Sequence, residues 1–349
     1  EDFMGERSAH YYVPQTSPLP PELTVESWAA GRAVESIQSN DPRPYFGFVS
    51  FVGPHPPIAP PVPFNRMYDP DAMSNPVRGD AKVDHMDEQI PWMNHAVWAE
   101  DINDSLARKI RARYYGKITH IDQCLGRILD AVEARADADN TVIVFYSDHG
   151  DHLGDHNGWQ KESFFDVSCR VPYLVSWPAR IAAGQARGEL VCLTDLFGIA
   201  TTAAGKQELR QGHDVLGGLA GTSPAREHLT GMYGIPGTPR FKIMAREKDW
   251  KYIYFANGAR AQLYNVSEAP REVRQRIADA PDVADRHAPL FHLLVDDPGQ
   301  VAPALFGQRR KVQADNVAVV GGGDAQVRFL DGLLDGSQGL AVPGLDGEQ

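Results

Sequence analysis

The spacing of hydrophobic residues in the first half of the chain predicts a strand, a long helix and a second strand. Residues 45–51 (YFGFVSF) form a short apolar and aromatic run, which is typical of a buried strand. Apolar residues then recur three and four positions apart from Leu106 to about Ala134, which predicts an amphipathic helix. The run 141–147 (TVIVFYS) predicts another buried strand. This order indicates a crossover unit in a mixed or mostly parallel sheet flanked by helices, an α/β fold.

Further elements are expected on both sides of this unit. An early helical segment has Trp28 among its candidate buried positions, and residues 70–100 are expected to form a long surface excursion. Residues 171–177 (VPYLVSW) predict a third strand. Residues 194–204 predict a short apolar helix, for which Gly205 is the expected C-cap.

The pattern changes after about residue 215, where short strands replace the helical periodicity. Residues 240–246 and 250–255 predict two antiparallel strands, 262–266 a further strand, and 270–280 a polar helix. These segments predict a small α+β appendage with an antiparallel sheet.

Three parts are therefore expected along the chain. Residues 1–215 would form the α/β domain and residues 216–300 the antiparallel-sheet subdomain. Residues 301–349 are rich in glycine and small side chains, which favours a partly flexible tail.

Composition and charge narrow the classes of function. The chain has 349 residues, of which 42% are hydrophobic and 23% charged, as is usual for a globular protein. Lys and Arg number 34 against 46 Asp and Glu, so the formal charge is −12. An acidic balance argues against nucleic-acid binding, although local cations can still attract an anionic substrate. No apolar run approaches the ~18 residues that would span a membrane.

The cysteines and the N-terminal residues bear on the compartment. Cys124, Cys169 and Cys192 are widely spaced and form no CxxC pair, so neither a disulfide framework nor a cysteine zinc site is indicated. We expect all three to be buried core residues. The first ten residues show neither an initiator Met nor a signal-peptide pattern. A signal could have been lost with a missing segment, so cytoplasmic and periplasmic locations both stay open.

The densest group of chemically active residues is Asp148-His-Gly-Asp-His-Leu-Gly-Asp-His156, directly after a predicted strand. Ligands and metals bind beyond the carboxyl ends of strands in open α/β sheets. Asp148 offers a carboxylate and His149 an imidazole, which could together hold one divalent cation. The alternative interpretation is a solvated acidic loop.

Two further residues could complete an anion site. Lys161 follows in the sequence Gly-Trp-Gln-Lys, and a lysine beside a divalent metal attracts a tetrahedral oxyanion. His55 lies between Pro54 and Pro56 just after the first predicted strand, where it could hold a substrate oxygen or protonate a leaving group. Taken singly, Lys161 could be a surface lysine and His55 a structural histidine.

Several motifs resemble the sulfatase family (arylsulfatase-like) of the alkaline phosphatase superfamily. The stretch RPYFGFVSFVGPHPPIAPP is similar to the family segment in which a Pro-His-x-Pro histidine follows a central strand. The block from YYGKITHIDQ through NTVIVFYSDHG to CRVPYLVSWP resembles the most recognisable C-terminal block of the family. The resemblance continues in register through KDWKYIYF and LYNVSE, and so covers residues 40 to 280. It implies an alkaline phosphatase-like fold.

Carried over by position, the resemblance implies that Asp148 and His149 are metal ligands, and that His55 and Lys161 contact the sulfate or phosphate group and its leaving oxygen. Calcium is the expected ion and manganese the alternative, because the Asp-His form also occurs in relatives that hydrolyse phosphate or phosphonate esters. The expected function is hydrolysis of a small-molecule sulfuric ester. Hydrolysis of phosphate or phosphonate monoesters is the alternative.

One departure from the family pattern is large. The family's N-terminal block carries paired metal-binding aspartates and a Cys/Ser-x-Pro-Ser-Arg motif that supplies the formylglycine nucleophile, and neither motif is present. We therefore expect residues 1–215 to be the C-terminal portion of a sulfatase-type domain. A missing N-terminal segment or chain, or a homo-oligomer, would then be the partner. A truncated, non-catalytic product or a binding module is the third interpretation.

Overall fold

The computed structural model describes residues 11–284, except residues 40, 42, 207, 209, 210, 237 and 257–260. The predicted tail at 301–349 and the last part of the predicted subdomain lie outside the described residues. Among the residues that are described, no helix has both the length and the apolar character needed to cross a bilayer.

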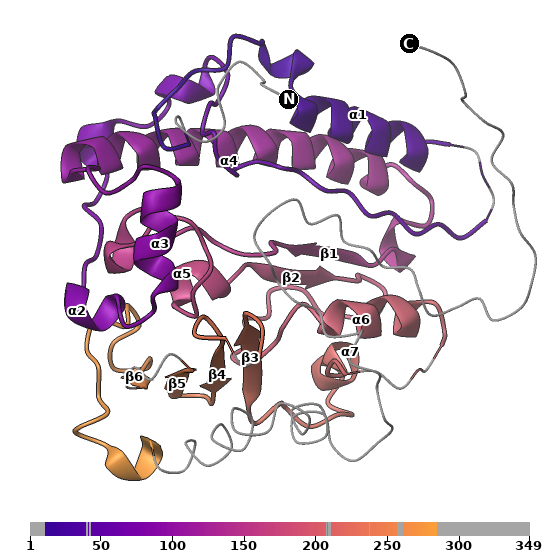
Figure 1. Cartoon of the computed structure of the whole chain (residues 1–349). Helices are drawn as coiled ribbons and strands as arrows, with labels where there is room; N and C mark the ends of the chain where they lie inside the picture. The colour runs from indigo at the N-terminus through magenta and orange to yellow at the C-terminus, as the bar shows by residue number, and fades with distance from the viewer. Residues whose placement is uncertain are drawn as a thin grey trace, which may run out of the picture.

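Two helices form a layer over one side of the molecule (Figure 1). The long α4 (Asp104–Glu133) confirms the predicted helix, and α1 (Val25–Ile37) packs along it. Ala30 and Ala33 of α1 meet Cys124 of α4 in a buried cluster, since small side chains allow close approach of two helices. The expectation that Trp28 is buried was wrong, because it lies outside this contact and is 65% exposed.

The strands form two antiparallel sheets. In the first, β1 (Ile143–Tyr146) pairs with β2 (Tyr173–Ser176), with Ile143 opposite Ser176. The second has the order β3-β4-β5-β6. Its strands are β3 (Leu229–Tyr233), β4 (Lys242–Arg246), β5 (Trp250–Phe255) and β6 (Gln262–Asn265). The two sheets confirm the strands predicted within 141–147, 171–177, 240–246, 250–255 and 262–266, whereas β3 was not predicted.

Shorter helices connect these parts. They are η1 (Pro21–Leu23), η2 (Phe64–Arg66), η3 (Pro70–Ala72), α2 (Ala81–Asp84), α3 (Gln89–Ala96), η4 (Ala138–Asn140), η5 (Asp155–Asn157), α5 (Asp166–Cys169), α6 (Asp195–Ala203) and α7 (Val215–Leu219). The helix predicted at 194–204 is α6, and Gly205 follows it at φ 72°, as expected for a C-cap glycine. The excursion at 70–100 is not only surface, because Ile90 and Met93 of α3 are buried.

Two predicted elements are wrong. Residues 45–51 form no strand and are mostly exposed, because no strand among the described residues pairs with them. Residues 270–280 form turns instead of a polar helix. Glu272 there has a left-handed φ of 52°, and its carboxylate is drawn inward to Lys251, so a helix cannot continue through it.

The second sheet is joined to the rest of the molecule by a shared core and by buried charges. Phe164 and Phe165 pack with Met93 of α3 against residues of β4, β5 and β6. Lys251 of β5, which is 1% exposed, lies 2.6 Å from Glu272 and also pairs with Asp166 of α5. Burial lowers the pKa of Lys251, but the neighbouring thiol and carboxylates outweigh it and raise the pKa above its usual range. The ammonium is therefore held charged inside the protein.

Replacing Lys251 by Met should strongly destabilise the fold. The substitution would leave the Glu272 and Asp166 carboxylates without their buried counter-ion, which costs about 3–5 kcal/mol in the free energy of unfolding. Denaturant titration followed by tryptophan fluorescence would measure this loss. Lys248→Met in the exposed turn before β5 is the matched control and should change the same quantity by less than about 0.5 kcal/mol. Equal losses in the two variants would contradict the role given to the buried pair.

Candidate active site

The first sheet ends in the aspartate–histidine pair that the sequence singled out. Directly after β1, the Asp148 side chain is 76% exposed and that of His149 is 28% exposed. His149 Nδ1 lies 2.8 Å from Gly150 O, and because a carbonyl only accepts, this nitrogen carries the hydrogen. The opposite ring nitrogen, Nε2, lies 3.2 Å from Asp148 Oδ2.

This pair of atoms fits a divalent cation. Two electron-rich atoms at 3.2 Å repel one another unless a proton or a cation lies between them. Ligands that bind one divalent ion at right angles, each at about 2.0–2.5 Å, are about 3 Å apart. Among the described residues, no group of three or more His, Cys, Asp or Glu side chains could hold a metal ion.

Gly150 holds the pair in place through a close backbone contact. Its N–H donates to Ser168 O of α5 at 2.7 Å, and a Cβ built on Gly150 would lie 2.0 Å from Val167 O. No side chain fits there, so glycine is required for the chain to turn against α5.

His55 and Lys161 meet although 106 positions separate them in the sequence. Lys161 Nζ lies 3.0 Å from His55 Nε2, and His55 Nδ1 donates to Pro56 O at 2.6 Å. The imidazole thus has a fixed tautomer whose Nε2 accepts from the ammonium. Tyr11 packs edge-on against the same ring, with centroids 5.8 Å apart.

A buried tyrosine–aspartate pair supports the loop between His149 and Lys161. Tyr12 OH donates to Asp151 Oδ2 at 2.6 Å and accepts from Gln160 N at 2.9 Å, so it connects the two ends of the loop. Burial raises the pKa of Asp151 to about 6, while the hydrogen bonds from Tyr12 and Leu153 and the charge of Lys161 oppose this shift. Burial and the Asp151 carboxylate raise the pKa of Tyr12 well above its usual value.

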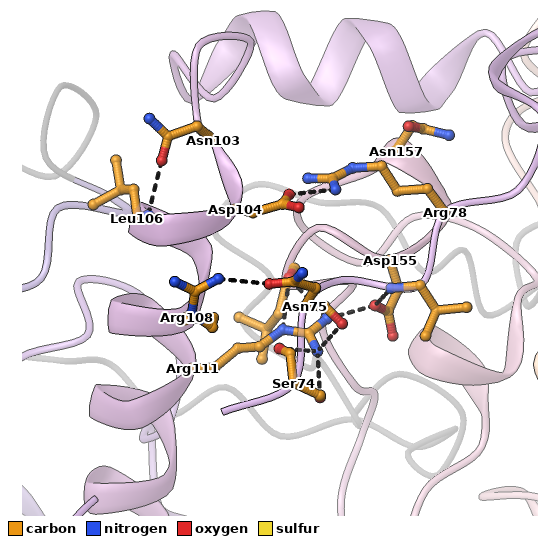
Figure 2. Close-up of polar contacts among 12 residues, drawn as sticks. Ser74, Asn75, Arg78, Asn103, Asp104, Leu106, Arg108, Arg111, Asp155 and Asn157 are labelled. Carbon is orange, nitrogen blue, oxygen red and sulfur yellow. Dashed lines mark hydrogen bonds and ion pairs between the residues drawn. The ribbon is translucent and has the colours of Figure 1, made fainter. Parts of the chain in front are cut away.

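The long helix α4 fixes the middle of this loop (Figure 2). Arg111 donates to Leu153 O at 3.1 Å and pairs with Asp155, and it also reaches Ser74 and Asn75. Neighbouring contacts join Arg108 to Asn75, and Arg78 to Asp104. The loop is therefore held from one side by a charged face of the helix.

The backbone of the loop is strained. Four residues other than glycine have left-handed φ values: Leu153 (47°), His156 (53°), Asn157 (53°) and Gln160 (73°). Such residues are uncommon, cost of order 1–3 kcal/mol each and cluster at functional sites. The hydrogen bonds and ion pairs described above compensate for this cost.

The other histidines of the motif are structural. His152 is buried between Asp155 O at 2.9 Å and Ser163 Oγ at 2.7 Å, and burial lowers its pKa to about 4. His156 is buried and stacks on Phe165 with ring centroids 3.8 Å apart. Neither ring is accessible to a substrate.

Tyr114 and Asp151 interact electrostatically with members of the two predicted couples. Burial, Asp151 and Asp148 raise the pKa of the half-buried Tyr114, and the charge of Lys161 opposes the rise in the pKa of Asp151. Electrostatic neighbours therefore link the aspartate–histidine pair to the lysine–histidine pair.

The cysteines differ from the expectation that all are buried. Cys124 is buried, but Cys192 is half-buried and Cys169 is an exposed residue. The sulfur of Cys169 nevertheless faces Phe164 O at 3.2 Å, and burial raises its pKa to about 11. A thiol with so high a pKa is a poor nucleophile at neutral pH.

Sequence reasoning missed Tyr12, Asp151 and Arg111. Tyr12 lies in an irregular segment, and Arg111 lies on a helix that was predicted only from its apolar positions. The signal for Asp151 was its place in the Asp-His-rich motif, three residues after Asp148.

Comparisons with known proteins identify the family of the chain. The family model described as Sulfatase matches residues 27–205, which is 179 of the 349 residues. An arylsulfatase of Clostridium perfringens is 28% identical over 263 residues, covering 73% of this chain and 54% of the relative. A multifunctional alkaline phosphatase superfamily protein of Trinickia caryophylli is 31% identical, covering 49% of this chain and 36% of the relative.

Among solved structures, a phosphonate monoester hydrolase of Agrobacterium radiobacter has a TM-score of 0.70 and 25% identity, covering 83% of this chain and 63% of that one. The chain spans about half the length, or less, of the curated relatives it matches. The fold is that of the alkaline phosphatase superfamily. With a family model matching half of its residues and the family motifs in register, the chain belongs to the sulfatase family.

Proposed function

We propose that the protein hydrolyses small-molecule sulfuric esters at a site that includes these residues. The observation that carries the proposal is the 3.0 Å contact of His55 with Lys161, which lies at the end of the loop that begins with Asp148 and His149. Two potential cation ligands and two potential oxyanion contacts, from distant parts of the sequence, suit a tetrahedral anionic ester.

Asp148 and His149 would hold the divalent cation, which we propose is calcium, with manganese as the alternative. When bound, the ion would supply Lewis-acid stabilisation of charge on the ester oxygens. The hard carboxylate suits either ion, and the imidazole favours manganese.

His55 and Lys161 would act on the substrate directly. The Lys161 ammonium is a fixed positive charge that can donate to a sulfate oxygen. His55 Nε2 now accepts from that ammonium, and in its protonated form it would donate a proton to the oxygen of the departing alcohol. Pro56 O holds the opposite ring nitrogen and so keeps Nε2 directed at the lysine.

The nucleophile is not among these 349 residues in the family's usual motif. We propose that the working site also takes residues from an N-terminal segment or chain outside this sequence, with a homo-oligomer as the alternative source. A non-catalytic product or binding module is the remaining interpretation, and two cation ligands alone would favour it.

Hydrolysis of phosphonate or phosphate monoesters is the second candidate reaction. The phosphonate monoester hydrolase of Agrobacterium radiobacter is similar in fold, and the Asp-His pair suits this chemistry equally. Turnover of an aryl sulfate and an aryl phosphonate by protein purified from its native source would separate the two. A larger kcat/KM for the phosphonate would contradict the sulfatase proposal, and no turnover of either would favour the binding module.

Removal of Asp148 should weaken cation binding. In Asp148→Asn the amide cannot supply a charged ligand, so the affinity for Mn²⁺ should fall at least about tenfold. Electron paramagnetic resonance of free Mn²⁺ during titration would measure the loss. Asp139→Asn, on the exposed side of η4, should bind Mn²⁺ like the parent. If Asp148→Asn kept full affinity, the proposed ligand would be wrong.

Removal of Lys161 should weaken anion binding. In Lys161→Met the site would lose its cationic donor, so the affinity for sulfate, measured by isothermal titration calorimetry with Mn²⁺ present, should fall about tenfold. The control is Lys109→Met on the exposed face of α4, which should leave the sulfate affinity unchanged. Equal affinities of all three proteins would show that sulfate binds elsewhere.

A further inference from the structure

The segment that begins at Lys161 is held by two buried lysines of the second sheet. Lys242 of β4 donates to Glu162 O at 2.6 Å, and Lys251 of β5 donates to Phe164 O at 2.8 Å. Both lysines are only 1% exposed. Two neighbouring strands thus each direct an ammonium group at a main-chain carbonyl of this segment. The lysine nearer to Lys161 in these contacts is Lys242, because its acceptor belongs to the very next residue.

Three groups enclose the ammonium of Lys242. In addition to the Glu162 carbonyl, it pairs with the Asp87 carboxylate and lies 4.8 Å from the centre of the Tyr233 ring. An ammonium has three N–H donors, and the face of an aromatic ring attracts a cation. The surroundings therefore hold the group in one place, with one donor directed at the carbonyl that follows Lys161.

Packing alone does not account for a lysine at this position. Burial lowers the pKa of Lys242, although the Asp87 carboxylate opposes the shift. A buried ion pair is often no more stabilising than apolar side chains of similar volume. The next two residues of β4, Ile243 and Met244, are buried apolar side chains, so the strand accommodates them. The hydrogen bond to Glu162 O gives the buried ammonium a role that an apolar residue could not fill.

The place of the Lys161 ammonium depends on the backbone that carries it. Lys161 O accepts from Ser163 N at 2.7 Å and from the hydroxyl of Ser168. Lys242 then holds the next carbonyl along the chain. Because the lysine side chain is a flexible four-carbon chain, its ammonium stays 3.0 Å from His55 only if the backbone below it does not rotate.

We propose that Lys242 is a positioning residue for Lys161. Its hydrogen bond to Glu162 O holds the backbone from which the Lys161 side chain reaches His55. The inference rests on the proposed function, in which Lys161 donates to an oxygen of the anionic ester. In this role Lys242 acts through the main chain and not on the substrate, and it makes the affinity for the anion depend on the second sheet.

A double substitution tests this role in the 349-residue protein. Lys242→Met alone would leave the Asp87 carboxylate buried without its counter-ion. Asp87→Asn/Lys242→Met removes both charges, and the asparagine oxygen can still accept from Gln89 N. After circular dichroism has established that this variant is folded, calorimetry with Mn²⁺ present should show a sulfate affinity about fivefold lower than that of the parent. Parent-like affinity would overturn the proposal, provided that Lys161→Met lowers it.

The ring nitrogens of His55 report the position of Lys161 without any ligand. Nε2 of His55 accepts from the Lys161 ammonium, and an accepted hydrogen bond shifts the nitrogen resonance of an imidazole. In spectra of protein labelled with ¹⁵N-histidine, the Nε2 resonance of the double variant should move toward its position in Lys161→Met. An unchanged Nε2 resonance in the folded double variant would overturn the proposal.

Ile243→Ala separates positioning from a general loss of stability. Successive side chains of a strand point to opposite faces, and Ile243 packs in the cluster with Phe241 and Leu263, away from Lys242. Truncating this fully buried residue weakens the same sheet. The sulfate affinity and the His55 resonance should nevertheless match those of the parent. Equal changes in this variant and in the double variant would mean that any damage to the sheet moves Lys161, which contradicts a specific role for Lys242.

The ligand-free signal also separates this inference from the proposed function. If the parent binds no sulfate while the Nε2 resonance of His55 responds to the double substitution, the positioning role holds and the proposed anion contact is wrong. If Lys161→Met itself leaves the Nε2 resonance unchanged, the contact between Lys161 and His55 is absent in solution. The positioning role of Lys242 would then be wrong as well.

Discussion

The loop between Asp148 and Lys161 depends on two buried polar anchors, and the arrangement of the candidate site depends on the loop. Tyr12 OH forms hydrogen bonds to Asp151 near one end of the loop and to Gln160 at the other. Between these ends, Arg111 of α4 donates to Leu153 O and pairs with Asp155. Since hydrogen bonds to charged groups contribute about 1.5–3 kcal/mol each, these contacts can offset several strained residues. These contacts hold the loop in the conformation that places Lys161 next to His55.

The proposed anion site lies in an acidic protein. The formal charge of −12 is spread over the surface, where it is screened within about 8 Å at physiological ionic strength. Close to His55 the nearest charge is the Lys161 ammonium, 3.0 Å away. The overall charge therefore says little about the ligand that the proposed site would take.

Elements with a strong periodicity of apolar residues, or with clear turn residues at their ends, could be predicted from the sequence. The helix α4 follows from its apolar spacing, and the strands β4 and β5 follow from two apolar runs on either side of a short polar turn. The candidate residues His55 and Lys161 were predicted from motifs, and the structure places them in contact.

The remaining features depend on contacts that no local pattern encodes. Tyr12 lies 139 positions from Asp151, so their hydrogen bond has no signal in spacing. The run at 45–51 has the composition of a core strand, yet strand formation requires a neighbour, and among the described residues it has none. Glu272 has the propensity of a helical residue, but its ion pair with Lys251 holds it in a left-handed turn.

The short helix α5 touches both halves of the molecule. Ser168 O accepts a hydrogen bond from the N–H of Gly150, one residue beyond the aspartate–histidine pair. The N–H of Asp166 donates to the Glu272 carboxylate, and the Asp166 side chain pairs with Lys251 of β5. A shift of the second sheet would thus be passed by rigid contacts to the backbone that orients His149. Sequence drift in that distant sheet can therefore change the geometry of Asp148 and His149 without altering either residue.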